Sequence, residues 1–172
     1  MNCWYMLTLV GEDRSGIVAE VTQTLFRLGY ELGEASMMRL GGNFAVMLMI
    51  HHPENKDGKD AAQEVAEKNQ LHVHLDEMKG GLHQHVEPNI QVTVSGADRP
   101  GIVAEVTGLL TEQGVNIVDL ESDVAGTTQR PLYIMYLQGV SQGEISGIQQ
   151  SLASLNQEGI EITVSEIDVL VG

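Results

Sequence analysis

The sequence GEDRSGIVAEVT at residues 11–22 recurs as GADRPGIVAEVT at residues 96–107, and only two of the twelve positions differ. A match of this length does not arise by chance, so the chain contains two copies of one structural unit of roughly 85 residues. In both copies the repeat begins where an apolar segment ends and leads into apolar residues at helical spacing. The two halves of the 172-residue chain are therefore expected to share one fold.

Hydrophobic periodicity around the repeat predicts a strand before it and a helix within it. Apolar and polar residues alternate ahead of each copy, which is typical of a half-buried strand. The inward positions of these strands are expected to be Tyr5, Leu7 and Leu9, and Ile90, Val92 and Val94. The helices that follow are expected to bury Ile17, Val18, Val21, Leu25 and Leu28, and Ile102, Val103, Val106 and Leu110. Gly29 and Gly114 then stand where helices commonly end.

The remaining elements complete the same order in each half. Hairpins are expected at 32–40 with 44–51 around Gly41-Gly42, and at 117–124 with 132–138 around a loop at 125–131. Helices are expected at 59–69 and 142–157, and closing strands at 71–78 and 160–169. The fold class is therefore α+β, with two ferredoxin-like βαββαβ units, each an antiparallel sheet with its helices on one face. We expect domains at 1–78 and 89–172, joined by a linker at 79–88.

The segment from Phe44 to Ile50 is apolar on both faces, although helices cover only one face of such a sheet. A strand of this kind needs a cover for its second face. The cover could be the other unit, a second chain or a protein partner. A small local core formed with the linker is the alternative.

Composition excludes several classes of partner. The chain has 24 Asp and Glu against 9 Lys and Arg, for a formal charge of −15. Binding to nucleic acid or to an anionic membrane depends on basic residues, so we expect neither. Cys3 is the single cysteine, which excludes an intrachain disulfide and favours a reducing, cytoplasmic location. No signal or membrane-spanning segment is expected.

The loop Asp-Arg-Ser/Pro-Gly between the first strand and first helix is the candidate functional element. Its glycine either permits a tight turn or exposes backbone N–H groups at a helix N-terminus, where a carboxylate is favoured. The loop aspartate is expected to cap the helix or to order the loop. The loop arginine either pairs with a carboxylate or stays solvated.

The stretch VSGADRPGIVAEVT at residues 94–107, followed by GVNI at 114–117, resembles an ACT domain. The first copy matches at 11–22 and continues with MRLGGNF at 38–44. Two such units, with that hairpin, are similar to the glycine cleavage system transcriptional repressor family. The resemblance implies regulatory modules that bind amino acids at interfaces between paired units, and it implies a homo-oligomer.

The resemblance also implies a set of ligand-binding residues in the two loops and at the start of one strand. These are Asp13, Arg14, Ser15, Gly16 and Ile17, then Asp98, Arg99, Pro100, Gly101 and Ile102, and Asn116. The first copy departs from the family at two positions. Ser15 replaces the usual proline, and Glu31 replaces the asparagine, so a ligand carboxylate would be repelled there while an ammonium would be attracted. The second unit is therefore the better candidate for amino-acid binding.

Other chemical signals are weak. His72 and His74 alternate on one strand, and His83 and His85 follow, but no carboxylate or cysteine spacing completes a metal site. The chain has no phosphate-binding Gly-Lys-Ser/Thr motif and no Gly-x-Ser-x-Gly nucleophile motif. We expect no cofactor, no metal and no catalytic activity.

The leading hypothesis is a non-catalytic regulator that senses a small amino acid, with glycine and serine as candidates. The family resemblance implies repression through contact with a transcriptional activator and without direct DNA binding. A second hypothesis is a detached regulatory subunit of a metabolic enzyme in amino-acid or folate metabolism. A third is a purely structural oligomer whose loops bind nothing.

Overall fold

A computed structural model describes residues 3–78, 86–97, 99–127, 130–156 and 159–167. The chain divides into two compact units. The first contains β1 (Trp4–Glu12), α1 (Ile17–Arg27), β2 (Glu31–Leu40), β3 (Asn43–His51), α2 (Lys59–Asn69) and β4 (His72–Glu77). The second contains β5 (Ile90–Gly96), α3 (Ile102–Glu112), β6 (Asn116–Thr127), β7 (Arg130–Val140), α4 (Ile145–Ala153) and β8 (Ile160–Glu166).

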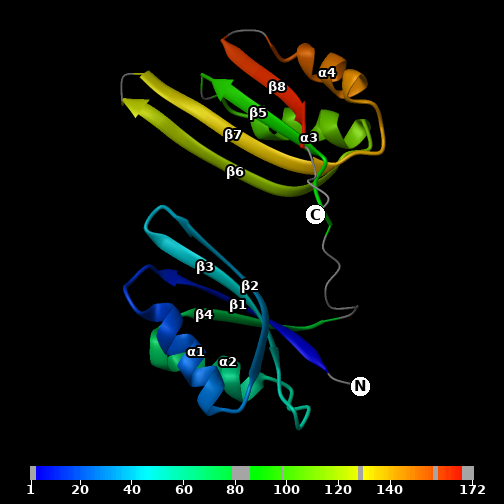
Figure 1. The fold of residues 1–172 in the computed structure, drawn as a ribbon. Helices are drawn as coiled ribbons and strands as arrows, with labels where there is room; N and C mark the ends of the chain where they lie inside the picture. The colour runs from blue at the N-terminus through cyan, green and yellow to red at the C-terminus, as the bar shows by residue number, and fades with distance from the viewer. Residues whose placement is uncertain (1–2, 79–85, 98, 128–129, 157–158, 168–172) are drawn as a thin grey trace. The chain divides into compact units, whose positions relative to one another are not determined.

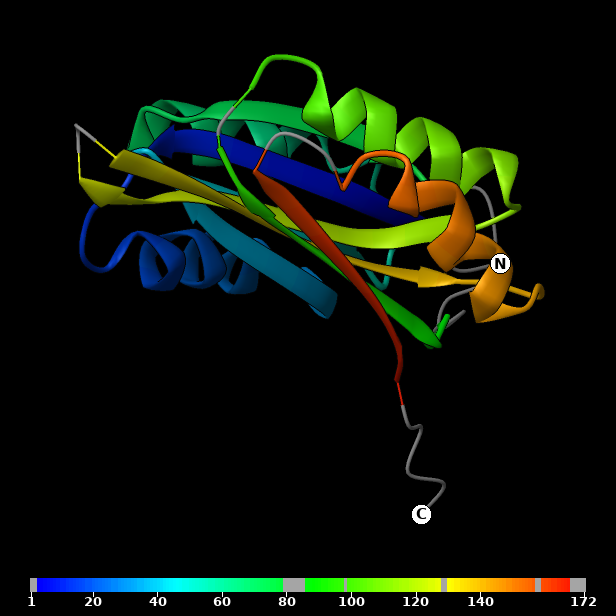
Figure 2. The same ribbon diagram turned by 90° about the horizontal axis from the view of Figure 1, so that it is seen from above.

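Each unit is one four-stranded antiparallel sheet with two helices on one face (Figure 1 and Figure 2). The strand order is β2-β3-β1-β4 in the first unit and β6-β7-β5-β8 in the second, so β2 and β6 are edge strands. The expected fold class, two ferredoxin-like βαββαβ units, is confirmed. The other face of each sheet carries no helix of its own unit.

The core of each unit lies between the sheet and its helices. Leu7, Leu9 and Leu25 are fully buried in the first unit, as predicted. Val18 and its counterpart Val103 are 41% and 38% exposed, so their predicted burial is wrong. Each stands about 100° around the helix from the preceding core isoleucine, which turns its side chain away from the core.

The first helix of each unit ends as the glycines predicted. The N–H of Gly29 donates to the carbonyl of Phe26, and the N–H of Tyr30 donates to that of Leu25. These two bonds and the positive φ of Gly29 (85°) define a Schellman motif, and Gly114 (φ 73°) ends α3 in the same way. Helices in the described part of the chain have at most 11 residues, too short and too polar to cross a membrane.

Two predicted boundaries in the second unit are wrong. The loop expected at 125–131 is largely strand, because β6 continues to Thr127 and β7 begins at Arg130. Gly126 adopts a positive φ of 89° and still pairs with Pro131, so these two residues do not break the hairpin. The helix expected at 142–157 is shorter, because Glu144 is extended and α4 begins only at Ile145.

Strand β3 buries one face in the core and half of the other. Phe44 and Ile50 point toward the helices and are buried. On the opposite face Met49 is covered, because Gly33 of β2 lets the ring of Trp4 approach; a side chain at position 33 would lie 2.9 Å from that ring. Met47 on the same face is 46% exposed. The second face of β3 is therefore covered at one end by its own unit and open at the other.

Candidate functional site

The two repeated loops have the same backbone conformation. Gly16 and Gly101 precede α1 and α3 with φ of 86° and 91°, a left-handed conformation that favours glycine. Their carbonyls accept the N–H of Glu20 (3.0 Å) and of Glu105 (2.9 Å), which begins each helix. Of the two roles considered for these glycines, the tight turn is present in both loops.

The outer side of each glycine is open space. A Cβ atom on Gly16 would meet no atom within 4 Å, and one on Gly101 would meet only a carboxylate oxygen of Glu105 at 3.8 Å. Within the described ranges no side-chain hydrogen bond caps α1 or α3, and the carboxylate of Asp13 pairs with Arg39 instead, so the predicted capping by Asp13 is wrong. An uncapped helix N-terminus with exposed backbone is favourable for a small carboxylate.

The loop arginine of each unit pairs with its own helix. Arg14 makes two hydrogen bonds to the carboxylate of Glu20, at 2.9 and 2.6 Å, and Arg99 makes the equivalent pair to Glu105. The arginine lowers the pKa of each glutamate carboxyl, chiefly through these hydrogen bonds. Sequence reasoning missed the glutamates, although the same six-residue Arg–Glu spacing in both copies indicates them.

Asp13 connects its loop to the β2–β3 hairpin. Its carboxylate pairs with Arg39 at 2.6 Å, and its N–H donates to the carbonyl of Gly42 at 3.1 Å. The alternative role predicted for Asp13, ordering the loop, therefore holds. Its counterpart Asp98 lies outside the described residues.

The other predicted loop residues divide into exposed and buried sets. Ser15 and Pro100 are exposed beside their glycines, where a ligand could reach them. The side chains of Ile17 and Ile102 lie in the two cores, so only their backbone faces the loop.

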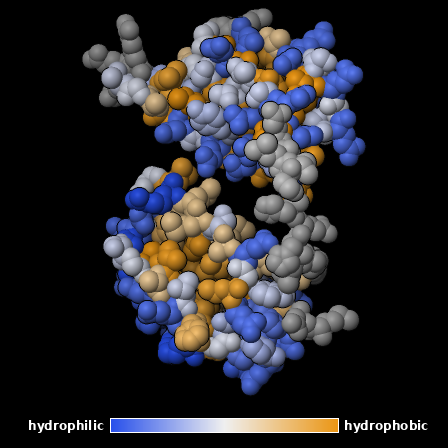
Figure 3. All heavy atoms as spheres, in the orientation of Figure 1, coloured by the Kyte–Doolittle hydropathy of each residue, from blue (hydrophilic) through white to orange (hydrophobic). Residues whose placement is uncertain are grey.

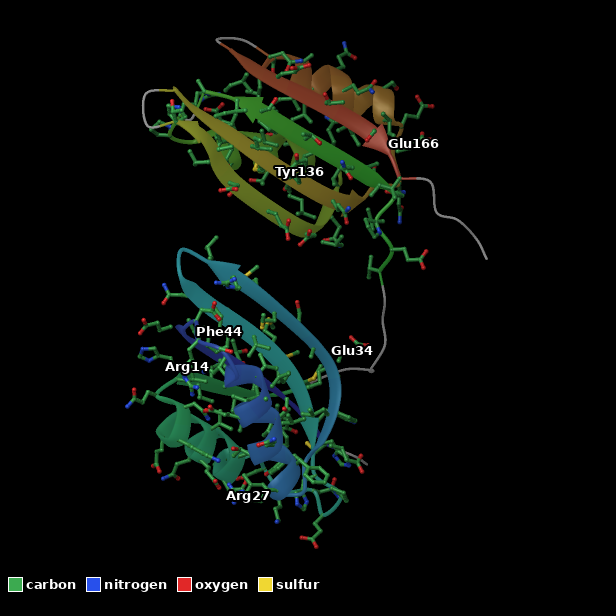
Figure 4. The ribbon with its side chains drawn as sticks, turned by 60° about the vertical axis from the view of Figure 1, so that its left-hand side comes forward. Arg14, Arg27, Glu34, Phe44, Tyr136 and Glu166 are labelled. Atoms are coloured by element: carbon green, nitrogen blue, oxygen red, sulfur yellow. The ribbon has the colours of Figure 1, made fainter. Side chains whose placement is uncertain are left out.

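Asn116 is not close to the glycine loop of its own unit. It follows the C-terminal end of α3, whereas Gly101 precedes the N-terminal end. A helix of 11 residues is about 16 Å long, so one small ligand cannot touch both. The same separation holds for Glu31 and Gly16, and Figure 4 shows Arg14 and Arg27 at the two ends of α1.

A cavity that the sequence did not indicate lies at the far end of α1. It has a volume of about 410 Å³. Its lining residues are Thr22, Phe26, Gly29, Tyr30, Glu31 and Leu32. The hydroxyl of Tyr30 donates to Asp60 at 2.5 Å, and burial together with this bond raises the pKa of the tyrosine. In the space-filling view, apolar side chains gather between α1 and β2 (Figure 3).

The histidine pairs do not form a metal site in the described chain. His72 and His74 are exposed on β4, and His74 lies 3.0 Å from Asp76. His83 and His85 lie outside the described residues. Within the described ranges, no three His, Cys, Asp or Glu side chains gather as metal ligands would.

Comparison with known proteins agrees with the repeat and the sheet topology. The ACT domain family matches residues 5–76 and again residues 89–165, which together make up most of the chain. The protein belongs to the ACT domain family and carries two ACT domains in tandem.

Three relatives show how far the similarity extends. A UPF0237 protein from Methanococcus maripaludis is 32% identical over 82 residues, which cover 47% of this chain and 90% of that one. A protein of unknown function from Galdieria sulphuraria has a crystal structure with a TM-score of 0.78 and 24% identity, covering 97% of this chain and 99% of its own. A protein described as a candidate glycine cleavage system transcriptional repressor has a TM-score of 0.68 and 16% identity, covering 97% and 98%. The last two show the same tandem fold.

Proposed function

We propose that this protein is a non-catalytic regulator that binds a small amino acid at its glycine loops and acts by protein contact on the glycine cleavage system. The observation that carries the proposal is the pair of repeated loops, whose glycines share one backbone conformation. Each presents an exposed glycine at a helix N-terminus that no side chain of the described residues caps, with open space beside that glycine. Glycine and serine are the ligands to test first, because Gly101 leaves room for a small molecule.

The edge strands indicate how a complete site could form in a pair of ACT units. Every residue of β2 is exposed, and β6 is exposed along nearly all its length. In antiparallel pairing of two edge strands, the start of one strand lies next to the end of the other. The end of β2 lies beside its own glycine loop, through Asp13 and Arg39. Pairing of edges from two copies would therefore bring Asn116 or Glu31 of one unit near a glycine loop of another.

Action by protein contact is supported by the charge and by the open face of the first sheet. A formal charge of −15 opposes binding to DNA. The open face of the first sheet exposes Val10, Met38, Leu40 and Met47, an apolar surface that fits a protein partner. The proposed link to the glycine cleavage system rests on the sequence resemblance. The solved structure of the candidate repressor supports only the shared fold.

Calorimetry with the twenty common amino acids tests the sensing function. We expect glycine or serine to bind at millimolar concentration or below, and Gly101→Val to abolish binding by the second unit. Capture from a native extract then tests the target: a transcriptional activator supports the proposal, and a metabolic enzyme supports the detached-subunit hypothesis.

A mobility-shift assay at low salt with the protein alone should retard no DNA.

A further inference from the structure

The cavity at the C-terminal end of α1 is a candidate ligand site distinct from the glycine loops of its unit. At about 410 Å³ it lies within the size range of small-molecule sites. All its lining residues fall between positions 22 and 32, on the last turns of α1 and the start of β2. The site is therefore built by the first unit alone.

The walls of the cavity are apolar. Phe26 is 82% exposed and Leu32 is 44% exposed, so both rims offer uncovered hydrocarbon surface. Tyr30 is buried and its hydroxyl donates a hydrogen bond to Asp60, so its ring carbons remain to form the wall of the cavity. Covering an exposed aromatic ring with an apolar group is favourable, because it removes both from water.

One charged group lines this apolar cavity. Glu31 is exposed, and no ion-pair partner approaches it among the residues that the structure describes. No Lys, Arg or His lines the cavity. The preferred ligand therefore has an apolar body and a positively charged group. In an amino acid that fits this description, the carboxylate must point away from Glu31.

The second unit has different residues at the two decisive positions. The repeat aligns Phe26 with Thr111 and Glu31 with Asn116. The aromatic wall and the carboxylate are both replaced by uncharged polar side chains. The two units therefore present different chemistry at the same place in one fold, and exchanging these residues gives natural test variants.

We propose that the first unit selects an amino acid with an apolar side chain, such as leucine. Its side chain packs against Phe26 and Leu32, and its ammonium group pairs with Glu31. This proposal rests on the proposed function, because it assumes that ACT units of this chain bind amino acids. It adds that the two units differ in the class of amino acid that they recognise.

Calorimetry of the full chain with leucine, glycine and N-acetyl-leucine tests the proposal. We expect Phe26→Thr to weaken leucine binding roughly tenfold and to leave glycine binding unchanged, since only leucine loses apolar contact. Glu31→Asn should weaken leucine binding, and N-acetyl-leucine, which lacks the ammonium, should bind wild type roughly tenfold more weakly than leucine does. Thr111→Ala in the second unit is the matched control and should leave leucine binding unchanged.

The outcomes separate this proposal from the proposed function. Unchanged leucine affinity in Phe26→Thr, or N-acetyl-leucine binding as tightly as leucine, overturns the apolar site. If glycine binds, Gly101→Val abolishes that binding and leucine does not bind, the proposed function stands and the apolar site falls. If no amino acid binds, both fall. Because Phe26 is exposed, Phe26→Thr should fold normally, and an unchanged melting temperature checks this.

Discussion

The two ACT units share a loop and a core but differ in the open face of the sheet. Met47 in the first sheet and Tyr136 in the second occupy the same position, each opposite a threonine of the central strand. The neighbouring edge residues are Ser36 and Met38 in the first unit and Glu121 and Asp123 in the second. The open face of the second sheet therefore carries carboxylates where the first carries a methionine and a serine. The two copies of the repeat have kept the residues of the loop, while the open faces of the two sheets have diverged.

The largest effect is expected where the units are most alike. Valine at position 16 or 101 must adopt a φ near +90°, which costs about 1–3 kcal/mol in either unit. Gly16→Val should lower the unfolding midpoint seen by fluorescence of Trp4, the single tryptophan, which lies in the first unit. Gly101→Val should lower the far-UV circular dichroism midpoint of the second. Gly108→Ala is the control, since a Cβ there meets nothing and alanine favours the helix. Two unaffected midpoints would show that the shared loop conformation is dispensable.

A core position distinguishes the units next. Phe44 and Tyr133 stand at equivalent positions, opposite Gly11 and Gly96, and both are buried. The Tyr133 hydroxyl is the buried side-chain atom without a hydrogen-bond partner in the described chain. Tyr133→Phe should therefore stabilise the second unit by about 1 kcal/mol, because it removes a desolvated hydroxyl.

The reverse exchange provides the matched test. Phe44→Tyr should destabilise the first unit by a similar amount, about 1 kcal/mol, read from Trp4 fluorescence in urea. Stabilisation by Phe44→Tyr, or loss of stability in Tyr133→Phe, would contradict the assignment of the unpaired hydroxyl as a cost.

The sequence was sufficient for the fold because the repeat supplied every element twice. Periodicity located Leu7, Leu25 and Ile90 in the cores, and the glycines located the helix ends. Periodicity wrongly predicted burial of Val18 and Val103, because helical spacing does not show how much of the helix surface the sheet covers. The ion pair between Asp13 and Arg39 depends on the packing of segments distant in sequence. The cavity beside Glu31 depends on the shape of the surface. The order of polar and apolar residues along one sequence does not contain that information.

Alkaline pH should affect the first unit more than the second through Tyr30. Burial and the bond to Asp60 raise the pKa of Tyr30, and its counterpart is Val115, which does not titrate. The stabilising contribution is complete below the tyrosine pKa of the unfolded chain, about 10, and is lost as pH rises toward the higher folded value. The urea midpoint reported by Trp4 should therefore fall above about pH 10. Tyr5, whose pKa is raised to about 12 chiefly by its hydrogen bond with Cys3, adds to the same trend.

Tyr30→Phe separates the two tyrosines. It removes the Tyr30 contribution, so the fall above about pH 10 should become shallower in this variant. Tyr5→Phe should flatten the remaining slope. An alkaline fall of the same steepness in Tyr30→Phe would show that the bond to Asp60 does not resist ionisation.

The smallest effect is expected from the arginine–glutamate pair that both units share. Glu20→Gln and Glu105→Gln remove the charge that pairs with Arg14 and Arg99, but these pairs are solvent-exposed, so each change should have little effect on stability. The lowered pKa of each glutamate means that this contribution is present above the ordinary carboxyl pKa and is lost as pH falls through the folded value. The informative readout is ligand binding, because each guanidinium stands beside a glycine loop. If the paired arginine only orders the loop, glycine binding should weaken slightly in Glu105→Gln. If the helix glutamate instead withholds the arginine from a ligand carboxylate, binding should strengthen and become more sensitive to salt. Equal responses in both variants would show that the loops still act alike, and a response from Glu105→Gln alone would show that the second unit has kept the binding role.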